Sequence, residues 1–139
     1  MKLVKKEIKF TTRGNADIVE ITGKVSDLVR ESGFSEGIIC LFVPGATAGI
    51  TTIELEQGLV KDFREMIARL IPANAGYSHN VSHMDGNAHS HLAASLIGPS
   101  LTIPFEKGGP VLGAWQQIIV VDFDNRPRDR KIIVKIIGE

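Results

Sequence analysis

The chain has 139 residues, of which 43% are hydrophobic and 23% charged, and 16 basic residues balance 16 acidic ones. This length and composition are typical of a single globular domain, here residues 1–139, whose core needs no disulfides. A net charge of zero excludes the strong positive field that attracts nucleic acid or an anionic membrane. One cysteine permits no disulfide within the chain, and no apolar run reaches membrane-spanning length, so we expect a cytoplasmic protein.

The first half of the chain is predicted to form strands interrupted by one helix. Alternating or continuous β-branched hydrophobicity predicts strands over residues 1–10, 17–21, 37–43 and 50–55. Between the second and third of these strands, Thr22 is expected to cap a helix and Gly33 to end it.

The second half begins with the clearest helix, because apolar residues recur at helical spacing over residues 59–71. After a polar loop, Asn87 is expected to cap a shorter helix, with Leu92 and Leu96 stacked on one face. Three further strands are predicted over residues 100–105, 116–123 and 131–137.

Strands and helices mix without regular βαβ alternation, so the predicted class is α+β: a compact single domain with antiparallel sheets and two to three helices. The strands over residues 116–123 and 131–137 follow each other closely, as hairpin arms do. Both are apolar on each face, which is more apolar surface than two useful helices can cover. We therefore expect sheet to pack against sheet, or against a neighbouring subunit.

All four histidines fall within the polar stretch of residues 77–91, which also holds the only tyrosine. Neutral imidazole binds borderline metals and carries protons near neutral pH, so this stretch is the candidate functional site; a polar surface loop is the alternative. The spacing matches neither a zinc finger nor the H-E-x-x-H metalloprotease pattern. Asp85 or Asn87 can fix the tautomer of a ligand imidazole. The candidate metal ligands are His79, His83, His89 and His91.

Helix geometry limits this set of ligands. If a helix begins after Asn87, the side chains of His89 and His91 point to different sides, whereas in an extended segment they face the same way. Histidine sites suit Zn, Fe, Ni or Mn, and three protein ligands with one open position form the catalytic kind of site.

Two other segments carry candidate chemistry. The run over residues 126–131 (RPRDRK) is either a solvated turn or a clamp for phosphate or carboxylate, because arginine binds both groups in a bidentate manner. Trp115 is either a core aromatic or an indole at the edge of a pocket for a heteroaromatic ring.

Several segments resemble the YjbQ family, also called the secondary thiamine-phosphate synthase family. The most specific are residues 100–105 (SLTIPF) and 113–118 (GAWQQI), with Gly108 between them. The resemblance extends over essentially the whole chain and further includes residues 47–51, Glu54, residues 77–79, His91, and residues 95–98 and 130–138.

This resemblance implies a trimer with sheets packed around the threefold axis, and a metal site carried here by His79 and His91. The implied activity is thiamine-phosphate formation, in which a hydroxymethylpyrimidine diphosphate is joined to a thiazole phosphate. Many relatives have His-Thr where this chain has Gly45-Ala46, so one expected imidazole is missing, and the extra His83 or His89 is expected to replace it. Ala114 also stands where the family has threonine before tryptophan.

Together the pattern and the resemblance assign provisional roles. The candidate catalytic residues are Glu54, Asp85 and Arg130, and the candidate substrate-binding residues are Thr47, Trp115, Gln116, Arg128 and Arg130. The expected cofactor is a divalent metal, zinc in the first place, with magnesium an option for a diphosphate substrate. The expected partners are a small phosphorylated metabolite and further copies of this chain.

A histidine-bound metal is better suited to activating water than to assisting the departure of diphosphate, which oxygen-held magnesium usually does. Three functions therefore stay open. The first is a transferase that makes thiamine phosphate. The second is a metal-dependent hydrolase of a small phosphorylated or heterocyclic metabolite, and the third is a non-catalytic trimer that binds metal or an anion.

Overall fold

A computed structural model describes residues 1–139 of the chain. It has the α+β architecture expected from the sequence, with antiparallel sheets and four helices. The elements in chain order are β1 (Lys2–Thr12), β2 (Asp17–Glu20), α1 (Thr22–Ser32), β3 (Glu36–Phe42), β4 (Ala48–Ile53), α2 (Gln57–Leu70), α3 (Ser78–Ser82), α4 (Ala88–Ile97), β5 (Ser100–Glu106), β6 (Gly109–Pro110), β7 (Gln117–Asp122) and β8 (Arg128–Gly138).

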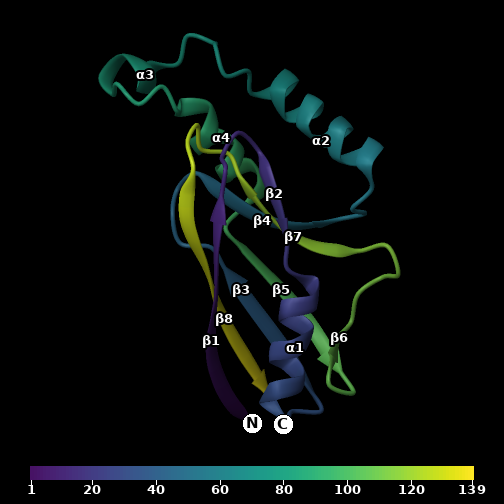
Figure 1. Ribbon diagram of the computed structural model, residues 1–139. Helices are drawn as coiled ribbons and strands as arrows, with labels where there is room; N and C mark the ends of the chain where they lie inside the picture. The colour runs from purple at the N-terminus through teal and green to yellow at the C-terminus, as the bar shows by residue number, and fades with distance from the viewer.

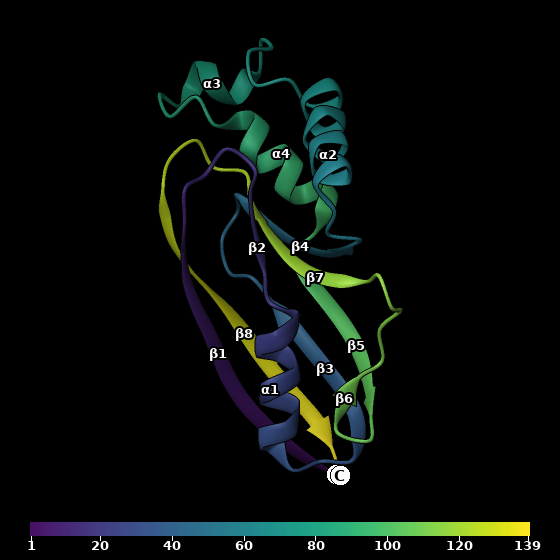
Figure 2. The same cartoon turned by 45° about the vertical axis from the view of Figure 1, so that its right-hand side comes forward.

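The strands form two sheets that lie in successive layers (Figure 1). The larger sheet has the order β1-β8-β3-β5-β6, and the smaller has the order β2-β7-β4. Helix α1 lies on the same side of the larger sheet as the smaller sheet does, and α2 and α4 lie beyond the smaller sheet (Figures 1 and 2). The smaller sheet is therefore covered on both sides.

The central strand β7 shows why its sequence is continuously apolar. Ile118 and Val120 belong to the core shared with the larger sheet and α1, whereas Ile119 and Val121 pack on the other side with residues of α2 and α4. All four side chains are fully buried. A strand with core on each face needs no polar alternation.

The expected hairpin between β7 and β8 is wrong. Strand β7 pairs with β2 and β4, whereas β8 pairs with β1 and β3 in the other sheet. The connection over residues 123–127 thus carries the chain from one sheet to the other. A short polar connection looks the same in the sequence whether it joins two arms of a hairpin or two strands of different sheets. The sequence pattern therefore did not distinguish a hairpin from a change of sheet.

Two helix starts also differ in detail from the sequence interpretation. The Thr22 hydroxyl does not cap α1; it accepts a hydrogen bond from Ile118 N at 2.8 Å and so ties the helix to β7. Helix α4 begins directly after Asn87, as expected, but the Asn87 side chain makes no capping bond. The end of α1 at Gly33 is confirmed, with a left-handed φ of 74°.

Helix α4 packs through small residues, which contradicts the expected leucine face. Leu92 and Leu96 are 47% and 58% exposed, whereas Ala93 and Ala94 are buried against β7. A Cβ built on Gly49 of β4 would lie 2.9 Å from the Ile97 side chain. Close approach of the helix to the sheet therefore requires small residues on both elements.

The outer face of the larger sheet has no helix over it (Figure 2). On this face β8 places Ile133 and Ile137 half-buried, and β3 places Ile38 and Phe42, which are exposed. This is the surplus apolar surface that the strand sequences indicated. No helix of the structure has both the length and the apolar character needed to cross a membrane.

Candidate functional site

The histidine stretch contains the single-turn helix α3, where the sequence indicated only a loop. Tyr77 anchors its beginning, since the hydroxyl donates to Pro72 O at 2.7 Å. Asn80 links it to α4, because its Oδ1 accepts from Ala88 N at 3.1 Å. The first bond ties Tyr77 back to Pro72, and the second ties α3 to the start of α4.

Three of the four imidazoles come together here, and we call His79, His83 and His91 the histidine cluster. The rings of His79 and His83 are stacked, with centroids 4.4 Å apart and planes at 14°. The rings of His79 and His91 meet edge to face at 5.0 Å and 70°. Neither His79 nor His91 forms a side-chain hydrogen bond, whereas His83 Nδ1 lies 2.9 Å from Ser82 Oγ.

The cluster matches a divalent metal such as zinc in donor type, since imidazole is one of its usual ligands. Imidazoles that share one tetrahedral zinc have ring centroids about 5 Å apart, given a Zn–N bond of about 2 Å. In the present rotamers no group of three or more His, Cys, Asp or Glu side chains is arranged to hold a metal. The parallel stacking of His83 on His79 is the reason, because parallel rings do not converge on one point. His83 is exposed.

His89 lies apart from the cluster, as expected for a residue two positions from His91 on a helix. It lines a separate cavity of about 230 Å³, which α2, α4 and Phe123 enclose with mainly apolar side chains. Its Nδ1 is buried and has no hydrogen-bond partner. Burial lowers the pKa of His89, and the charge of Asp124 opposes this only in part.

A polar cavity of about 170 Å³ lies where the loop before α4 meets the loop after β7. Asn125 joins the two loops, because its Nδ2 donates to Asp85 O at 2.8 Å. Asn87 lines the cavity, and His91 of the cluster lies one helical turn further along α4, since its N donates to Asn87 O at 3.2 Å. The cavity is lined by Asp85, Asn87, Asp124, Asn125, Arg126 and Arg128.

Beneath this cavity the ends of four strands meet in a hydrogen-bonded group that we call the strand-end network. Arg130 forms a fork on Asp122: its Nε lies 2.8 Å from Oδ2 and its Nη2 lies 3.0 Å from Oδ1. Arg130 Nη2 also donates to Thr47 Oγ1 at 2.6 Å. The members of the network are Thr12, Thr47, Asp122, Asp124, Arg128 and Arg130.

Asp124 forms the second half of the network. Its Oδ2 accepts from Thr47 at 3.1 Å and from Arg128 Nε at 2.8 Å. Its Oδ1 accepts from Asn125 N at 2.8 Å. Asp122 and Asp124 are fully buried, so these contacts replace the water that both carboxylates lose.

The network holds both carboxylates in the charged form. Burial alone raises the pKa of Asp122, but hydrogen bonds from Arg130 and Thr12 outweigh burial and lower that pKa. For Asp124, burial likewise raises the pKa, and bonds from Asn125 N, Arg128 and Thr47 lower it further than burial raises it. Hydrogen bonds donated to a carboxylate stabilise its ionised form and so lower its pKa.

These contacts correct the interpretation of the arginine run as a solvated turn. The Arg130 side chain is only 9% exposed, and its Nε and Nη2 are already bonded inside the molecule. Arg128 is 34% exposed and also pairs with Asp124. Arg130 and Thr47 therefore hold the strand ends together, and Arg126 and Arg128 are the arginines that line the polar cavity before α4.

Gly45 has a backbone conformation and a neighbour that restrict which residues can replace it. Its φ is +123°, a conformation that side chains rarely adopt, and a Cβ there would lie 2.9 Å from Arg130 Nη1. A histidine at this position is therefore incompatible with the present course of the chain.

The remaining candidates do not gather at the histidine cluster. Trp115 is 74% exposed in the loop before β7, which contradicts the core-aromatic interpretation. Gln116 stabilises that loop, accepting from Gly113 N at 3.0 Å and donating to Thr52 Oγ1 at 3.1 Å. Glu54 is exposed directly after β4. In Figures 1 and 2 the loop between β6 and β7 lies on the opposite side of the molecule from α3.

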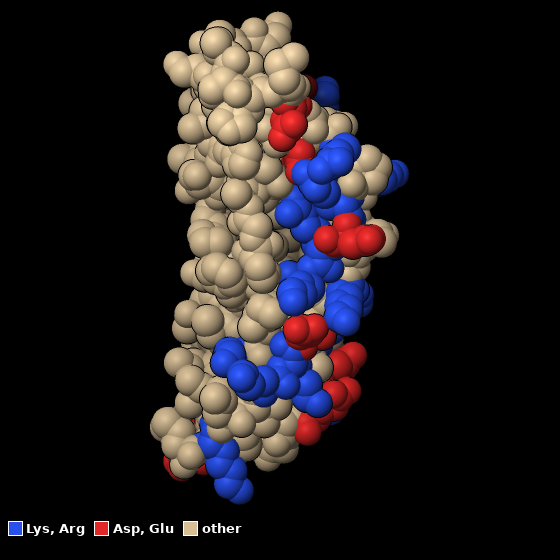
Figure 3. Space-filling model, turned by 90° about the vertical axis from the view of Figure 1, so that its left-hand side faces the viewer, with Lys and Arg blue, Asp and Glu red and all other residues tan.

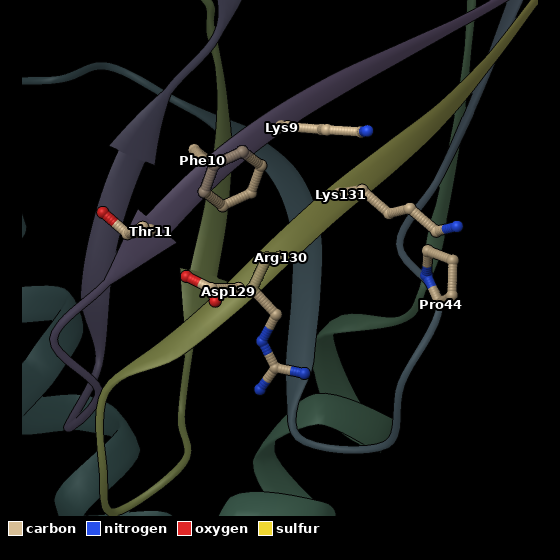
Figure 4. A pocket seen from close by; sticks show the side chains of 7 residues that line it. All are labelled: Lys9, Phe10, Thr11, Pro44, Asp129, Arg130 and Lys131. Carbon is tan, nitrogen blue, oxygen red and sulfur yellow. The ribbon is translucent and has the colours of Figure 1, made fainter.

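A second concave surface lies on the outer face of β1 and β8, with a volume of about 590 Å³ (Figure 4). Lys9 and Lys131 are direct cross-strand partners and extend toward Pro44, and Thr11 and Asp129 form a second such pair two residues along. Figure 3 shows Lys and Arg side chains in a band along this side of the molecule, with Asp and Glu among them. No histidine lines this surface.

Sequence reasoning missed Asp122, Asp124 and Asn125. A signal was present, because Asp122 ends a strand whose neighbours are all apolar, and a buried carboxylate requires a cationic partner. The run of arginines shortly after it supplies that partner.

Comparisons with known proteins match the whole chain. A family model described as UPF0047 protein YjbQ-like covers residues 6–139. A UPF0047 protein of Methanocaldococcus jannaschii is 38% identical over 142 residues, covering 100% of this chain and 99% of the relative. A UPF0047 protein of Archaeoglobus fulgidus is 36% identical over 129 residues, covering 93% and 98%.

Solved structures agree with the architecture. The crystal structure of a YbjQ-like protein of unknown function from Sulfolobus solfataricus gives a TM-score of 0.93 at 35% identity and covers 99% of both chains. A hypothetical protein from Aeropyrum pernix gives a TM-score of 0.90 at 32% identity, covering 98% of this chain and 99% of that one.

Proposed function

Since the chain belongs to the UPF0047 YjbQ-like family, whose solved relatives have no stated function, we propose a function from the site itself: metal-dependent hydrolysis of a small phosphorylated metabolite. The observation that carries the proposal is the packing of three imidazoles at centroid distances of 4.4 and 5.0 Å. The His79 and His91 nitrogens form no side-chain hydrogen bond within the chain, and His83 forms one, between Nδ1 and Ser82 Oγ.

His79, His83 and His91 would hold the metal, zinc in the first place. A metal bound by imidazoles lowers the pKa of a bound water and so supplies hydroxide at neutral pH. Asp85 is exposed beside the cavity and is suited to accept a proton. Arg126 and Arg128 are suited to bind the anionic part of a substrate, because both line the polar cavity.

Arg130, Thr47 and the rest of the strand-end network act as positioning residues in this proposal. Arg128 Nε and Nη2 both contact Asp124, at 2.8 and 2.7 Å, which fixes the direction of its guanidinium. Holding a cation in place before the ligand arrives reduces the entropy that binding costs.

The transferase implied by the family resemblance is the competing function. It needs an aromatic slot for a pyrimidine and a cationic clamp for diphosphate, close to each other. Within one chain Trp115 is exposed on a loop far from α3 in both views, and two nitrogens of Arg130 are occupied. The single chain therefore favours hydrolysis over transfer.

We further propose that the chain assembles as a homotrimer through the outer face of the larger sheet. That face carries Ile38 and Phe42 at 43% and 42% exposure and has no helix over it. Exposed apolar surface of this kind is typical of subunit contacts. Light scattering should give three times the chain mass, and a monomer at micromolar concentration would contradict the assembly.

Metal analysis combined with an assay separates the three functions. We expect the purified protein to carry zinc or a similar metal, and to hydrolyse a simple phosphate monoester until a chelator removes that metal. Magnesium-dependent thiamine-phosphate formation that survives removal of the tight metal would instead establish the transferase. Metal retained without turnover of any phosphate compound would establish the non-catalytic alternative.

A further inference from the structure

The cavity beside His89, between α2 and α4, is mainly apolar and shares no residue with the histidine cluster or with the polar cavity before α4. Seven of its ten lining residues are hydrophobic, among them Ile67, Ile71 and Phe123. Its volume is about 230 Å³. An apolar cavity of about 150 Å³ inside a protein holds one benzene molecule. The cavity beside His89 therefore has room for a single ring with one small substituent.

Arg64 is the one Lys, Arg, Asp or Glu residue that lines this cavity. Its Nε donates to Ala16 O at 3.0 Å, and Ala16 lines the cavity as well, so the guanidinium lies at the cavity edge. The side chain is exposed and forms no ion pair, and Nη1 and Nη2 form no hydrogen bond within the chain. A guanidinium with two free nitrogens and no acidic group in the cavity matches a carboxylate.

The backbone that orients this guanidinium is held in an uncommon conformation. Asn15 and Ala16 have φ values of 56° and 63°, which side chains rarely adopt and which persist only where the surroundings impose them. Asn15 N donates to Asp124 O at 2.6 Å, and Ala16 N donates to Asp122 O at 2.8 Å. These bonds fix the Ala16 carbonyl, and thereby the guanidinium bonded to it, before any ligand arrives. Such preorganisation reduces the entropy that binding costs.

From these observations we propose that the cavity beside His89 binds a small carboxylate whose apolar part is about the size of one ring. The apolar part fills the space between α2 and α4, and the carboxylate accepts from Nη1 and Nη2 of Arg64 at the edge. This binding goes beyond the proposed hydrolysis and does not depend on it, because none of the residues assigned to hydrolysis lines this cavity.

Three probes titrated into the full chain near neutral pH test the proposal. Benzoate has both parts of the ligand, benzyl alcohol has the ring without the charge, and acetate has the charge without a ring. A chelator is present, so that metal at the histidine cluster binds no carboxylate. We expect benzoate to bind at millimolar concentration or below, and about 10-fold or more tightly than either partial probe. No benzoate binding, or an equal affinity for benzoate and either partial probe, would overturn the proposal.

Variants on one helix locate the binding. Arg64→Gln should weaken benzoate binding by about 10-fold or more and leave benzyl alcohol binding unchanged. Arg69→Gln removes the same charge from an exposed position of α2 outside the cavity and should change neither. Ala68→Leu extends a side chain that lines the cavity, so it should weaken both ring compounds. Ala68 is exposed and leucine is a good helix former, so this variant should fold, which circular dichroism checks.

Benzoate binding that is unchanged in Arg64→Gln and in Ala68→Leu would show that the anion binds elsewhere on the molecule, and the proposal would be wrong. The hydrolysis assay has a separate outcome. Benzoate binding without metal-dependent turnover would remove the proposed function and keep this site. Turnover without benzoate binding would keep the proposed function and remove this site.

Discussion

The strand-end network and the histidine cluster are both polar groups assembled from distant parts of the chain, yet they differ in how their hydrogen bonds are used. In the network, Asp122 and Asp124 have partners for both carboxylate oxygens and are fully buried. In the cluster, the side chains of His79 and His91 touch each other but form no hydrogen bond inside the molecule. The first arrangement is complete and stabilises the fold, while the second is incomplete and is suited to bind something.

The contrast teaches that residue type alone does not identify a site. Arginine beside aspartate looks as functional in a sequence as a group of histidines does. The two are separated by whether their donors and acceptors are already occupied, which only the folded arrangement reveals.

The largest expected effect is that of removing the cation at the centre of the network. Arg130→Ala leaves the buried Asp122 carboxylate without its main partner, which should lower the free energy of unfolding by about 3–5 kcal/mol. Urea unfolding followed by circular dichroism measures this. Arg30→Ala, which removes an exposed pair with Asp27 on α1, is the matched control and should cost less than about 1 kcal/mol. Equal losses in the two variants would contradict the structural role of Arg130.

A smaller loss is expected where the network meets the loop before β4. Gly45→Ala places a Cβ at a φ of +123° and 2.9 Å from Arg130 Nη1, so we expect a cost of about 1–3 kcal/mol. Gly76→Ala is the control, since a Cβ there meets nothing within 4 Å and its φ is not positive. It should be neutral or slightly stabilising. A harmless Gly45→Ala would show that a larger residue fits beside Arg130.

How far the sequence predicts this molecule depends on which interactions are local. The end of α1 at Gly33, the start of α4 after Asn87 and the continuous burial of β7 were predicted correctly. All three depend on residues that are neighbours in the sequence. The sheet to which β7 and β8 belong depends on pairings between residues far apart in the sequence, such as Ile50 with Val120 and Lys2 with Gly138. Local patterns carry no information about such pairings.

The candidate site also has one part that depends on local sequence and another that depends on contacts between distant residues. The separation of His89 from His91 follows from helix geometry and was foreseen as one of two cases. The polar cavity joins Asp85 to Asn125 across forty residues, and the Arg130 fork depends on β7 and β8 lying in adjacent sheets. These contacts required the fold.

Lowering the pH tests the strand-end network without any substitution. The pKa values of Asp122 and Asp124 lie below the ordinary value of 3.8 in the folded protein, so the unfolded chain binds protons first as the pH falls. Stability is therefore fully present above about pH 4 and is lost as the pH passes below 3.8 toward the folded-state pKa values. Unfolding free energies measured at stepwise lower pH check this. In Asp122→Asn the decline should be shallower, and an unchanged slope would exclude Asp122 as its source.

The smallest effect on stability is expected in the histidine cluster, where the effect on metal should be large. His83→Ala removes an exposed imidazole that contacts mainly His79 and Ser82, so unfolding should change by less than about 0.5 kcal/mol. If His83 completes the ligand set with His79 and His91, the same variant should lose most of its bound metal, because one of three coordinate bonds is gone.

His89→Ala is the matched comparison, since it is the same substitution six residues along the chain but outside the cluster. It opens space beside the cavity between α2 and α4, so it should cost stability, about 1–2 kcal/mol, and keep the metal. Elemental analysis and urea unfolding are applied to both variants. His83→Ala should lose metal and keep its stability, whereas His89→Ala should lose stability and keep its metal. Metal lost from His89→Ala and retained by His83→Ala would show that the ligands gather on the other side of α4, which would reverse the contrast drawn between the two regions.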